Sequence, residues 1–375
     1  MNKIIIFIIL LYVLAFTSGI FFNYFNLSEF LFPSVFVLGT LFTSIVYKCS
    51  KHEKNLIKYS IYLYLLIFPL SVYTSLYNGH EIDIYYFTRY SIKFLSVPIT
   101  AYMVFYLSSH NSIFDTLLKI FFFINITFQL VSLKYTSFFA DILLIDPENY
   151  RPSGIYSNPN VLCFFNSAFL LYELYKSKKN YFLIAAILLS TLLTFSRTGL
   201  LVSIFIVIYY YTKKGGVKKL IYSSILLSIV GMLFMYYFGN LSVFQRLFDF
   251  SSETIEKSRF LLWSYSLAQV IDSNAILGLG LGEMDNIVDF LGSEGLGPHN
   301  TFIYMYGVSG IMGLIFFIIY NFKLYSLIAL RTNIPVYLIS SIFLFQFFFN
   351  HDTMYLPITG FAIGLISSTN LKKMM

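Results

Sequence analysis

Charged residues are scarce in this sequence. Only 11% of the 375 residues are Asp, Glu, Lys or Arg, whereas 58% are apolar. Soluble domains carry about 25% charged residues. The mean hydropathy of +0.74 points the same way. So few charges cannot cover the surface of a soluble protein of this length, and the sequence therefore predicts an integral membrane protein.

Cysteines and the common nucleotide- and metal-binding motifs are also scarce. Cys49 and Cys163 are the two cysteines, which excludes a disulfide framework and a Cys-rich metal site. The sequence contains no Walker A loop and no HExxH motif, and its five histidines stand singly. We therefore expect no metal site, no cofactor and no ATP-driven transport by this chain alone.

Long apolar windows fill most of the chain. A helix that crosses the hydrocarbon core takes about 20 mostly apolar residues. Twelve windows approach or exceed that length: 4–22, 30–47, 59–77, 86–107, 113–133, 157–175, 181–196, 198–212, 220–239, 299–320, 333–350 and 354–370. The expected fold class is all-α, a polytopic membrane helix bundle of about 11–12 transmembrane helices.

The distribution of Lys and Arg indicates the orientation, because cytoplasmic loops are enriched in both residues. With a cytoplasmic N-terminus, 16 of the 25 basic residues fall in inward loops and ends. Among the 18 carboxylates, only Glu53, Asp115 and Glu173 lie near the inner face. We therefore expect both termini in the cytoplasm. The net charge of +7 then reports orientation, and no nucleic-acid partner is expected.

Residues 240–298 interrupt the pattern as a long segment on the outer side. Within it, Ser258–Ile271 has the pattern of an amphipathic helix that lies along the membrane surface, and a glycine-rich stretch follows. The chain is thus expected to divide into helices one to nine in 1–239, a large extracytoplasmic loop in 240–298, and helices ten to twelve in 299–375.

Arginines on the outer side oppose the inward bias of the cations. Arg151 precedes the sixth window, Arg197 lies between the seventh and eighth, and Arg259 opens the amphipathic helix, with Trp263 one turn later. Each alone is also compatible with an arginine anchored at the membrane interface. Together they suit an anionic headgroup, because a guanidinium binds phosphate through two hydrogen bonds and keeps its charge.

Two further groups of residues are candidates for the same chemistry. Arg89 and Lys93 lie one helical turn apart in the outer half of the fourth window, where they either contact phosphate or reach to the interface. His299 follows Gly-Pro and opens the tenth window. It is either a helix-start residue or an imidazole that accepts a proton at neutral pH.

Four motifs, taken in order, resemble the Wzy/O-antigen ligase superfamily of bacterial envelope glycan enzymes. The resemblance covers about residues 150–320. The motifs are Ser157-Asn158-Pro159-Asn160 after Arg151, Ser196-Arg197-Thr198-Gly199, Arg259 with Trp263 and the glycines 278–282, and His299-Asn300 followed by Gly307, Gly310 and Gly313.

This resemblance implies metal-independent, inverting glycosyl transfer from an undecaprenyl-diphosphate-linked oligosaccharide at the outer face of the bacterial inner membrane. His299, Arg259 and Arg197 would be catalytic. Arg151, Arg89, Lys93, Trp263 and Asn300 would bind substrate. The implied partners are the lipid-linked oligosaccharides, membrane lipid, and the chain-length regulator and flippase of the same pathway.

Three other functions compete with a polymerase of repeat units into O-antigen or capsular polysaccharide. An O-antigen ligase, which passes the glycan to lipid A–core, would use the same residues. We favour the polymerase because polymerases vary greatly in sequence and the first half of this chain matches little. A lipid-linked oligosaccharide flippase would also have about twelve spans, but the long outer loop and the lack of an internal repeat argue against it. A non-catalytic scaffold is the fourth option.

Overall fold

The computed structural model describes the chain at 39, 51–80, 84–110, 112–143, 150–156, 158–215, 221, 253–281, 283–286, 300–349 and 357–369. Its regular elements are all helical, and no strand occurs in these ranges, which confirms the predicted fold class. The windows 4–22, 30–47 and 220–239 lie outside the described residues, apart from Gly39 and Ile221.

The helices follow the predicted windows closely. They are α4 (Lys51–Tyr77), α5 (Ile84–His110), α6 (Ser112–Lys134), α7 (Thr136–Leu143), α8 (Pro159–Tyr175), α9 (Tyr181–Leu193), α10 (Arg197–Tyr210), the π-helix η2 (Tyr211–Gly215), α13 (Glu253–Asn274), α14 (Glu283–Asn286), α15 (Thr301–Thr332), α16 (Val336–Phe349) and α17 (Pro357–Ser367). A helix, α13, is present where the amphipathic helix was expected, whereas its amphipathic character and its position along the membrane surface stay predictions.

Several elements differ from the prediction: α4 begins at Lys51, eight residues before the window 59–77, and the short elements α14 and η2 were not expected. Helix α7 was not expected, because its eight residues are too few for an apolar window of membrane length. Helix α15 continues twelve residues beyond the predicted window 299–320, because Gly and Pro are absent between 321 and 332. It ends at Asn333, whose left-handed backbone (φ 57°) caps it. Lys323 and Arg331, two of the 16 basic residues expected in inward loops and ends, therefore lie in the helix.

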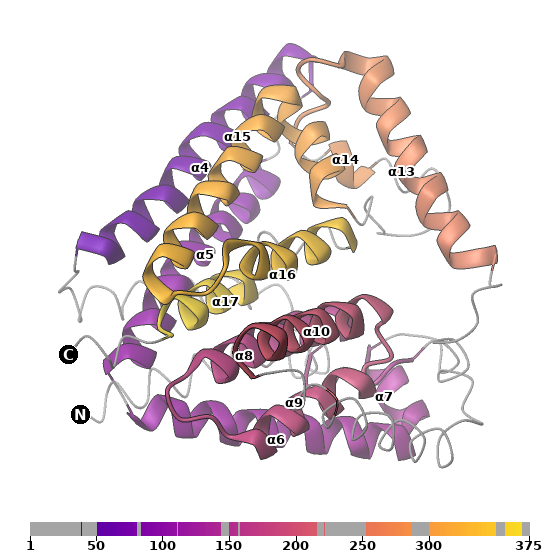
Figure 1. The fold of residues 1–375 in the computed structure, drawn as a ribbon. Helices are drawn as coiled ribbons and strands as arrows, with labels where there is room; N and C mark the ends of the chain where they lie inside the picture. Colours follow the sequence, from indigo (N-terminus) through magenta and orange to yellow (C-terminus); the bar gives the residue numbers. More distant parts are fainter. Residues whose placement is uncertain are drawn as a thin grey trace.

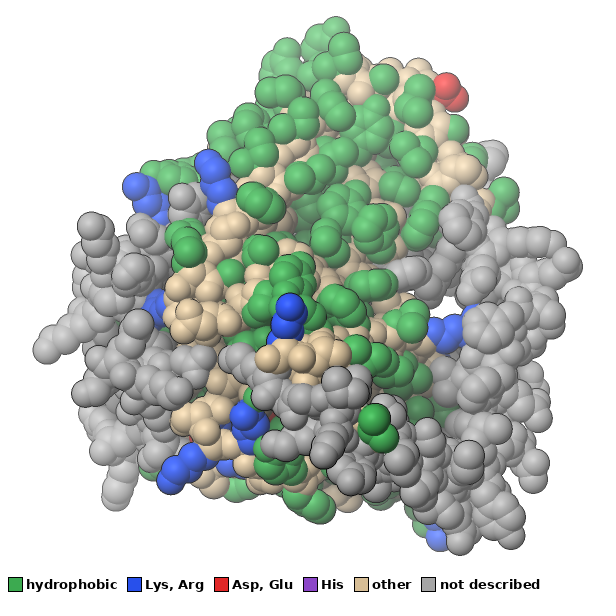
Figure 2. All heavy atoms as spheres, viewed as in Figure 1, with side chains coloured by type: hydrophobic (Ala, Val, Ile, Leu, Met, Phe, Trp, Pro, Cys, Tyr) green, Lys and Arg blue, Asp and Glu red, His purple; other side chains and the backbone are tan. Residues whose placement is uncertain are grey.

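Several helices have the apolar composition that a membrane requires. Ile113–Lys134 and Thr301–Thr332 are long and apolar enough to cross it, and five described helices are apolar but shorter. In Figure 2, hydrophobic side chains are spread over the described surface of one face, and Lys and Arg stand at separate places among them. The chain is a helical membrane protein, whereas its number of spans and its orientation stay predictions.

The helices pack in a mixed bundle in which α16 and α17 lie between two groups (Figure 1). Helix α4 runs against α15 and α5 on one side, and α8 packs with α9 and α10 on the other. Helix α17 contacts both α5 and α8. A Cβ at Gly360 or Gly364 of α17 would collide with the backbone of α5, so the pair lets these two helices approach closely.

Helix α15 bends sharply at Gly310, which has φ 67° and ψ −171°. The next amide, of Ile311, is bonded to the carbonyl of Ile276 at 3.0 Å instead of to its own helix. A Cβ at Gly310 would collide with the backbone of Ile276 and Leu277. Glycine is required here both for the left-handed backbone and for this contact.

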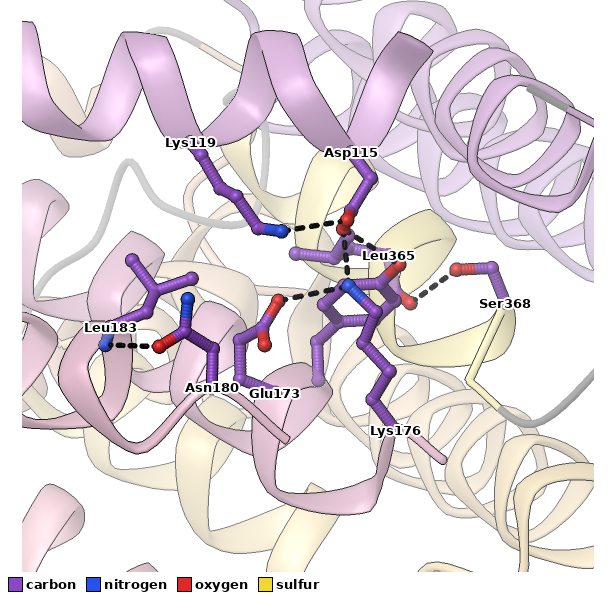
Figure 3. A network of polar contacts seen from close by, with 9 residues as sticks. Asp115, Lys119, Glu173, Lys176, Asn180, Leu183, Leu365 and Ser368 are labelled. Atoms are coloured by element: carbon purple, nitrogen blue, oxygen red, sulfur yellow. Dashed lines mark hydrogen bonds and ion pairs between the residues drawn. The ribbon is translucent and has the colours of Figure 1, made fainter. Parts of the chain in front are cut away.

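A network of ion pairs joins the beginning of α6 to the end of α8 (Figure 3). Asp115 accepts from Lys119 at 3.0 Å and from Lys176 at 2.5 Å. Lys176 also lies 3.3 Å from Glu173, whose side chain is fully buried. The charges at this end of α8 therefore neutralise one another.

Candidate active site

The turn between α9 and α10 places Arg197 at the start of a helix. Ser196 caps α10 by accepting a hydrogen bond from the amide of Gly199 at 3.3 Å. Phe195, just before the cap, is a non-glycine residue with positive φ (51°), a conformation that costs about 1–2 kcal/mol. Its side chain is buried, and that burial offsets the cost. The tight turn is thus held by an aromatic anchor and a serine cap.

The start of α8 lies directly beside the start of α10. Asn158 caps α8 by accepting from the amide of Asn160 at 2.8 Å. The hydroxyl of Ser196 donates to the side-chain oxygen of Asn160 at 3.0 Å. A Cβ at Gly199 would collide with Cys163 of α8, so glycine sets how closely the two helix starts approach. The serine and glycine of the Ser-Arg-Thr-Gly motif therefore join α10 to α8.

A small cavity of about 20 Å³ opens between these helix starts and α16, room for about one water molecule. Its polar lining includes Asn160, Ser196 and Gln346. Gln346 belongs to α16, whose last turn contacts the start of α15: the rings of Phe302 and Phe348 are 5.0 Å apart. The end of α16 therefore connects the α8–α10 pair to the start of α15.

The start of α15 carries the same kind of cap as α8 and α10. The side-chain oxygen of Asn300 accepts from the amides of Phe302 at 2.9 Å and Ile303 at 3.2 Å, and Asn300 is buried. The role that the structure shows for Asn300 is thus to cap the helix. Its expected contact with substrate stays a prediction.

Several positive groups lie close together in this region. The N-terminus of an α-helix carries about half a positive charge, so the paired starts of α8 and α10 form a positive region. Arg197 is the first residue of α10. Arg151 lies seven residues before the α8 cap Asn158, near enough for its positive charge to act at Cys163 of α8. Two arginines from separate segments and two helix starts thus make a setting that favours an anion.

The remaining predicted site residues lie on other elements or outside the described part. Trp263 of α13 is half-buried and packs against the main hydrophobic core. Arg259 belongs to α13, and Arg89 and Lys93 belong to α5 one turn apart, but their side chains lie outside the described residues. His299 also lies outside them, one residue before the Asn300 cap. These assignments stay predictions.

Two polar residues of this region were not recognised as candidates from the sequence. Asn160 was quoted in a motif without a role, and Gln346 was not considered. Gln346 is 7% exposed in the otherwise apolar helix α16. A buried amide in an apolar span is the signal that sequence reading had available.

Comparison with known proteins now adds to this geometry. A family model described as O-antigen ligase matches residues 182–318. The matched range includes Arg197, Arg259 and His299, whereas Arg89, Lys93 and Arg151 precede it. No curated protein matches the chain. The match agrees with the resemblance seen in the sequence motifs, and residues 182–318 of the chain are similar to the O-antigen ligase family.

Proposed function

We propose that this protein polymerises lipid-linked oligosaccharide repeat units into O-antigen or capsular polysaccharide. The donor is an oligosaccharide on undecaprenyl diphosphate, and the reaction takes place at the outer face of the bacterial inner membrane. The chain crosses that membrane several times, with both termini in the cytoplasm. The match to the O-antigen ligase family model supports the enzyme class, and the basic residues at the starts of α8 and α10 support the type of donor.

The observation that carries this proposal is the pairing of the α8 and α10 starts beside Arg151 and Arg197. In the transfer, an acceptor hydroxyl attacks the anomeric carbon, and the bond from that carbon to the diphosphate oxygen breaks. Negative charge then grows on the departing diphosphate. Helix N–H groups and guanidiniums that are already in place stabilise such charge where it develops.

His299 completes the proposed chemistry. It stands immediately before the α15 start, which lies against the end of α16. In this proposal His299 either accepts the proton of the acceptor hydroxyl as a general base or positions this hydroxyl for attack. General-base help is worth about 10²–10⁴ in rate, so His299→Ala is expected to abolish visible polymer at a normal protein level.

A second variant separates the two roles of His299. Glutamine forms hydrogen bonds but takes no proton at neutral pH. Substantial polymer from His299→Gln would remove the role as a base and keep the positioning role. Full polymer from His299→Ala would refute both.

A ligase is the second candidate, because the matching family model is described as O-antigen ligase. The bond chemistry is the same, and only the acceptor differs. Deletion of the gene followed by a gel of the surface glycan distinguishes the candidates. Loss of a polymerase removes the long-chain ladder and retains single capped units, whereas loss of a ligase leaves lipid A–core without glycan. Repeat units trapped on the inner face would indicate a flippase and contradict both.

A further inference from the structure

A second, larger pocket is lined by residues of α13, α14 and the segment at the end of α4, at the other end of α13 from Arg259. Its volume is about 420 Å³, within the range of about 300–1,000 Å³ that is typical of small-molecule sites. Five of its six lining residues are polar or charged. The lining consists of Asn78, His80, Gln269, Ser273, Leu279 and Glu283.

The pocket is held open by a clamp on its glycine-rich wall. The Asn78 amide nitrogen donates to the carbonyls of Gly278 at 2.9 Å and Leu279 at 3.0 Å. The hydroxyl of Ser75 accepts from the amide of Leu281 at 2.7 Å. A Cβ at Gly280 would collide with Ser75, so the wall lies directly on α4. The end of α4 thus fixes this wall from one side.

Helix α15 fixes the same wall from the other side. The carbonyl of Gly307 accepts from the amides of Leu279 at 2.6 Å and Gly280 at 3.1 Å. The bend at Gly310 is tied to Ile276, as described above. Because backbone bonds hold the wall on both faces, the pocket is formed before any ligand arrives. A preformed site avoids the entropy cost of ordering on binding.

The lining offers both donors and acceptors to a ligand. Within the described part of the chain, neither the Gln269 amide nor the Ser273 hydroxyl forms a hydrogen bond. Nδ1 of His80 lies 3.4 Å from Oε1 of Glu283, and both side chains are about one-third exposed, so they are accessible from the pocket. Amides, an imidazole, a hydroxyl and a carboxylate together match ligand hydroxyl groups, which donate and accept at once.

We propose that this pocket binds the sugar hydroxyls of the oligosaccharide repeat unit. The proposal rests on the function proposed above and adds a glycan subsite to it. Leu279 supplies an apolar patch for a sugar face, and the mixed polar lining favours an uncharged glycan over a diphosphate. Gln269 lies ten residues after Arg259 on α13, about 15 Å along the helix axis. A ligand that reaches both is an extended oligosaccharide.

Binding of the free repeat unit to the purified full-length protein tests this subsite. The probe is the repeat-unit oligosaccharide released by mild acid from its undecaprenyl-diphosphate-linked precursor in the host strain, titrated by ligand-observed NMR against protein in lipid nanodiscs. Gln269→Ala and the isosteric Glu283→Gln are each expected to raise its Kd by about tenfold, which corresponds to about 1.4 kcal/mol for the lost hydrogen bonds. The matched control is Ser264→Ala, on an exposed position of α13.

The outcomes separate the subsite from the reaction. Weaker binding by both pocket variants, with unchanged binding by Ser264→Ala, supports the subsite. If the protein shows this binding pattern but deletion of its gene leaves the glycan ladder intact, the subsite is supported and the polymerase function is refuted. Absence of binding by the unaltered protein, or pocket variants that bind as tightly as it does, would overturn the subsite even where the ladder depends on the gene.

Discussion

The two ends of α8 are both polar but are built in opposite ways. At its C-terminal end, Lys176 lies between the carboxylates of Asp115 and Glu173, so the charges neutralise one another (Figure 3). At its N-terminal end, positive helix dipoles lie side by side and arginines enter from two other segments. The first arrangement needs no ligand, whereas the second is more stable with an anion present.

This difference teaches which basic residues to associate with function. A lysine inside a closed ion-pair network contributes to folding, and a point charge is sufficient there. An arginine at a paired helix start offers a planar group with several donors to a phosphate, which lysine does not reproduce. Replacing arginine by lysine at the N-terminal end of α8, and lysine by arginine at its C-terminal end, therefore tests this difference directly.

Arg197→Lys is expected to have the largest effect. Loss of one charge-stabilising donor typically lowers the rate by about 10²–10³, so the long-chain glycan ladder should disappear while the protein level stays normal. The reverse exchange at the other end, Lys119→Arg, is the control and should leave the ladder intact. A normal ladder from Arg197→Lys would show that the planar guanidinium is not required, and that Arg197 supplies only a positive charge or anchors the chain at the interface.

Lys176→Met should cost the most stability. It leaves the fully buried Glu173 and the nearby Asp115 without their shared cation. Breaking a buried ion pair costs about 3 kcal/mol or more. Equilibrium unfolding in mixed micelles measures this loss of unfolding free energy. A loss below about 1 kcal/mol, the range of an exposed pair, would show that the network is not a closed structural unit.

Gly199→Ala tests how closely the starts of α8 and α10 must approach. The added methyl meets Cys163, and overpacking of this kind costs about 1–3 kcal/mol. We expect a moderate loss of stability with a shorter or fainter ladder. Cys163→Gly in the same chain should recover part of both. If the double variant is no better than Gly199→Ala alone, the strain lies elsewhere in the turn.

Lys119→Met is expected to have the smallest effect. Lys119 is about one-third exposed and pairs with Asp115 one turn away on the same helix. Such pairs contribute about 0.3–0.5 kcal/mol, because solvent screens them. The same unfolding titration should therefore separate it clearly from Lys176→Met. Equal losses of unfolding free energy for the two variants would mean that Lys119 and Lys176 contribute equally to the stability of the network.

The helices themselves were predictable because apolar length is a local property. The windows 181–196 and 198–212 correspond to α9 and α10 although only three residues, Thr194 to Ser196, separate the helices. The reversal at Phe195 was not predictable, since a left-handed aromatic residue contradicts local preference and is held by its burial.

The features that the sequence did not predict depend on contacts between residues far apart in the chain. Gly307, Gly310 and Gly313 were noted in the sequence, but which of them bends α15 depends on its contact with Ile276. His80 stood in the sequence as a single histidine, and its partner Glu283 lies about 200 residues later in the chain. No local pattern contains that pairing, so the pocket had no signal in the sequence.

The clamp on the glycine-rich wall also has a consequence for biosynthesis. The Asn78 amide and its carbonyl partners at Gly278 and Leu279 are 200 and 201 residues apart. At translation rates of about 5–20 residues per second, the end of α4 waits about 10–40 s for this partner. The wall then needs α15 as well, so the pocket closes only after most of the chain has left the ribosome. A nascent chain therefore has its early helices in place well before this pocket is complete.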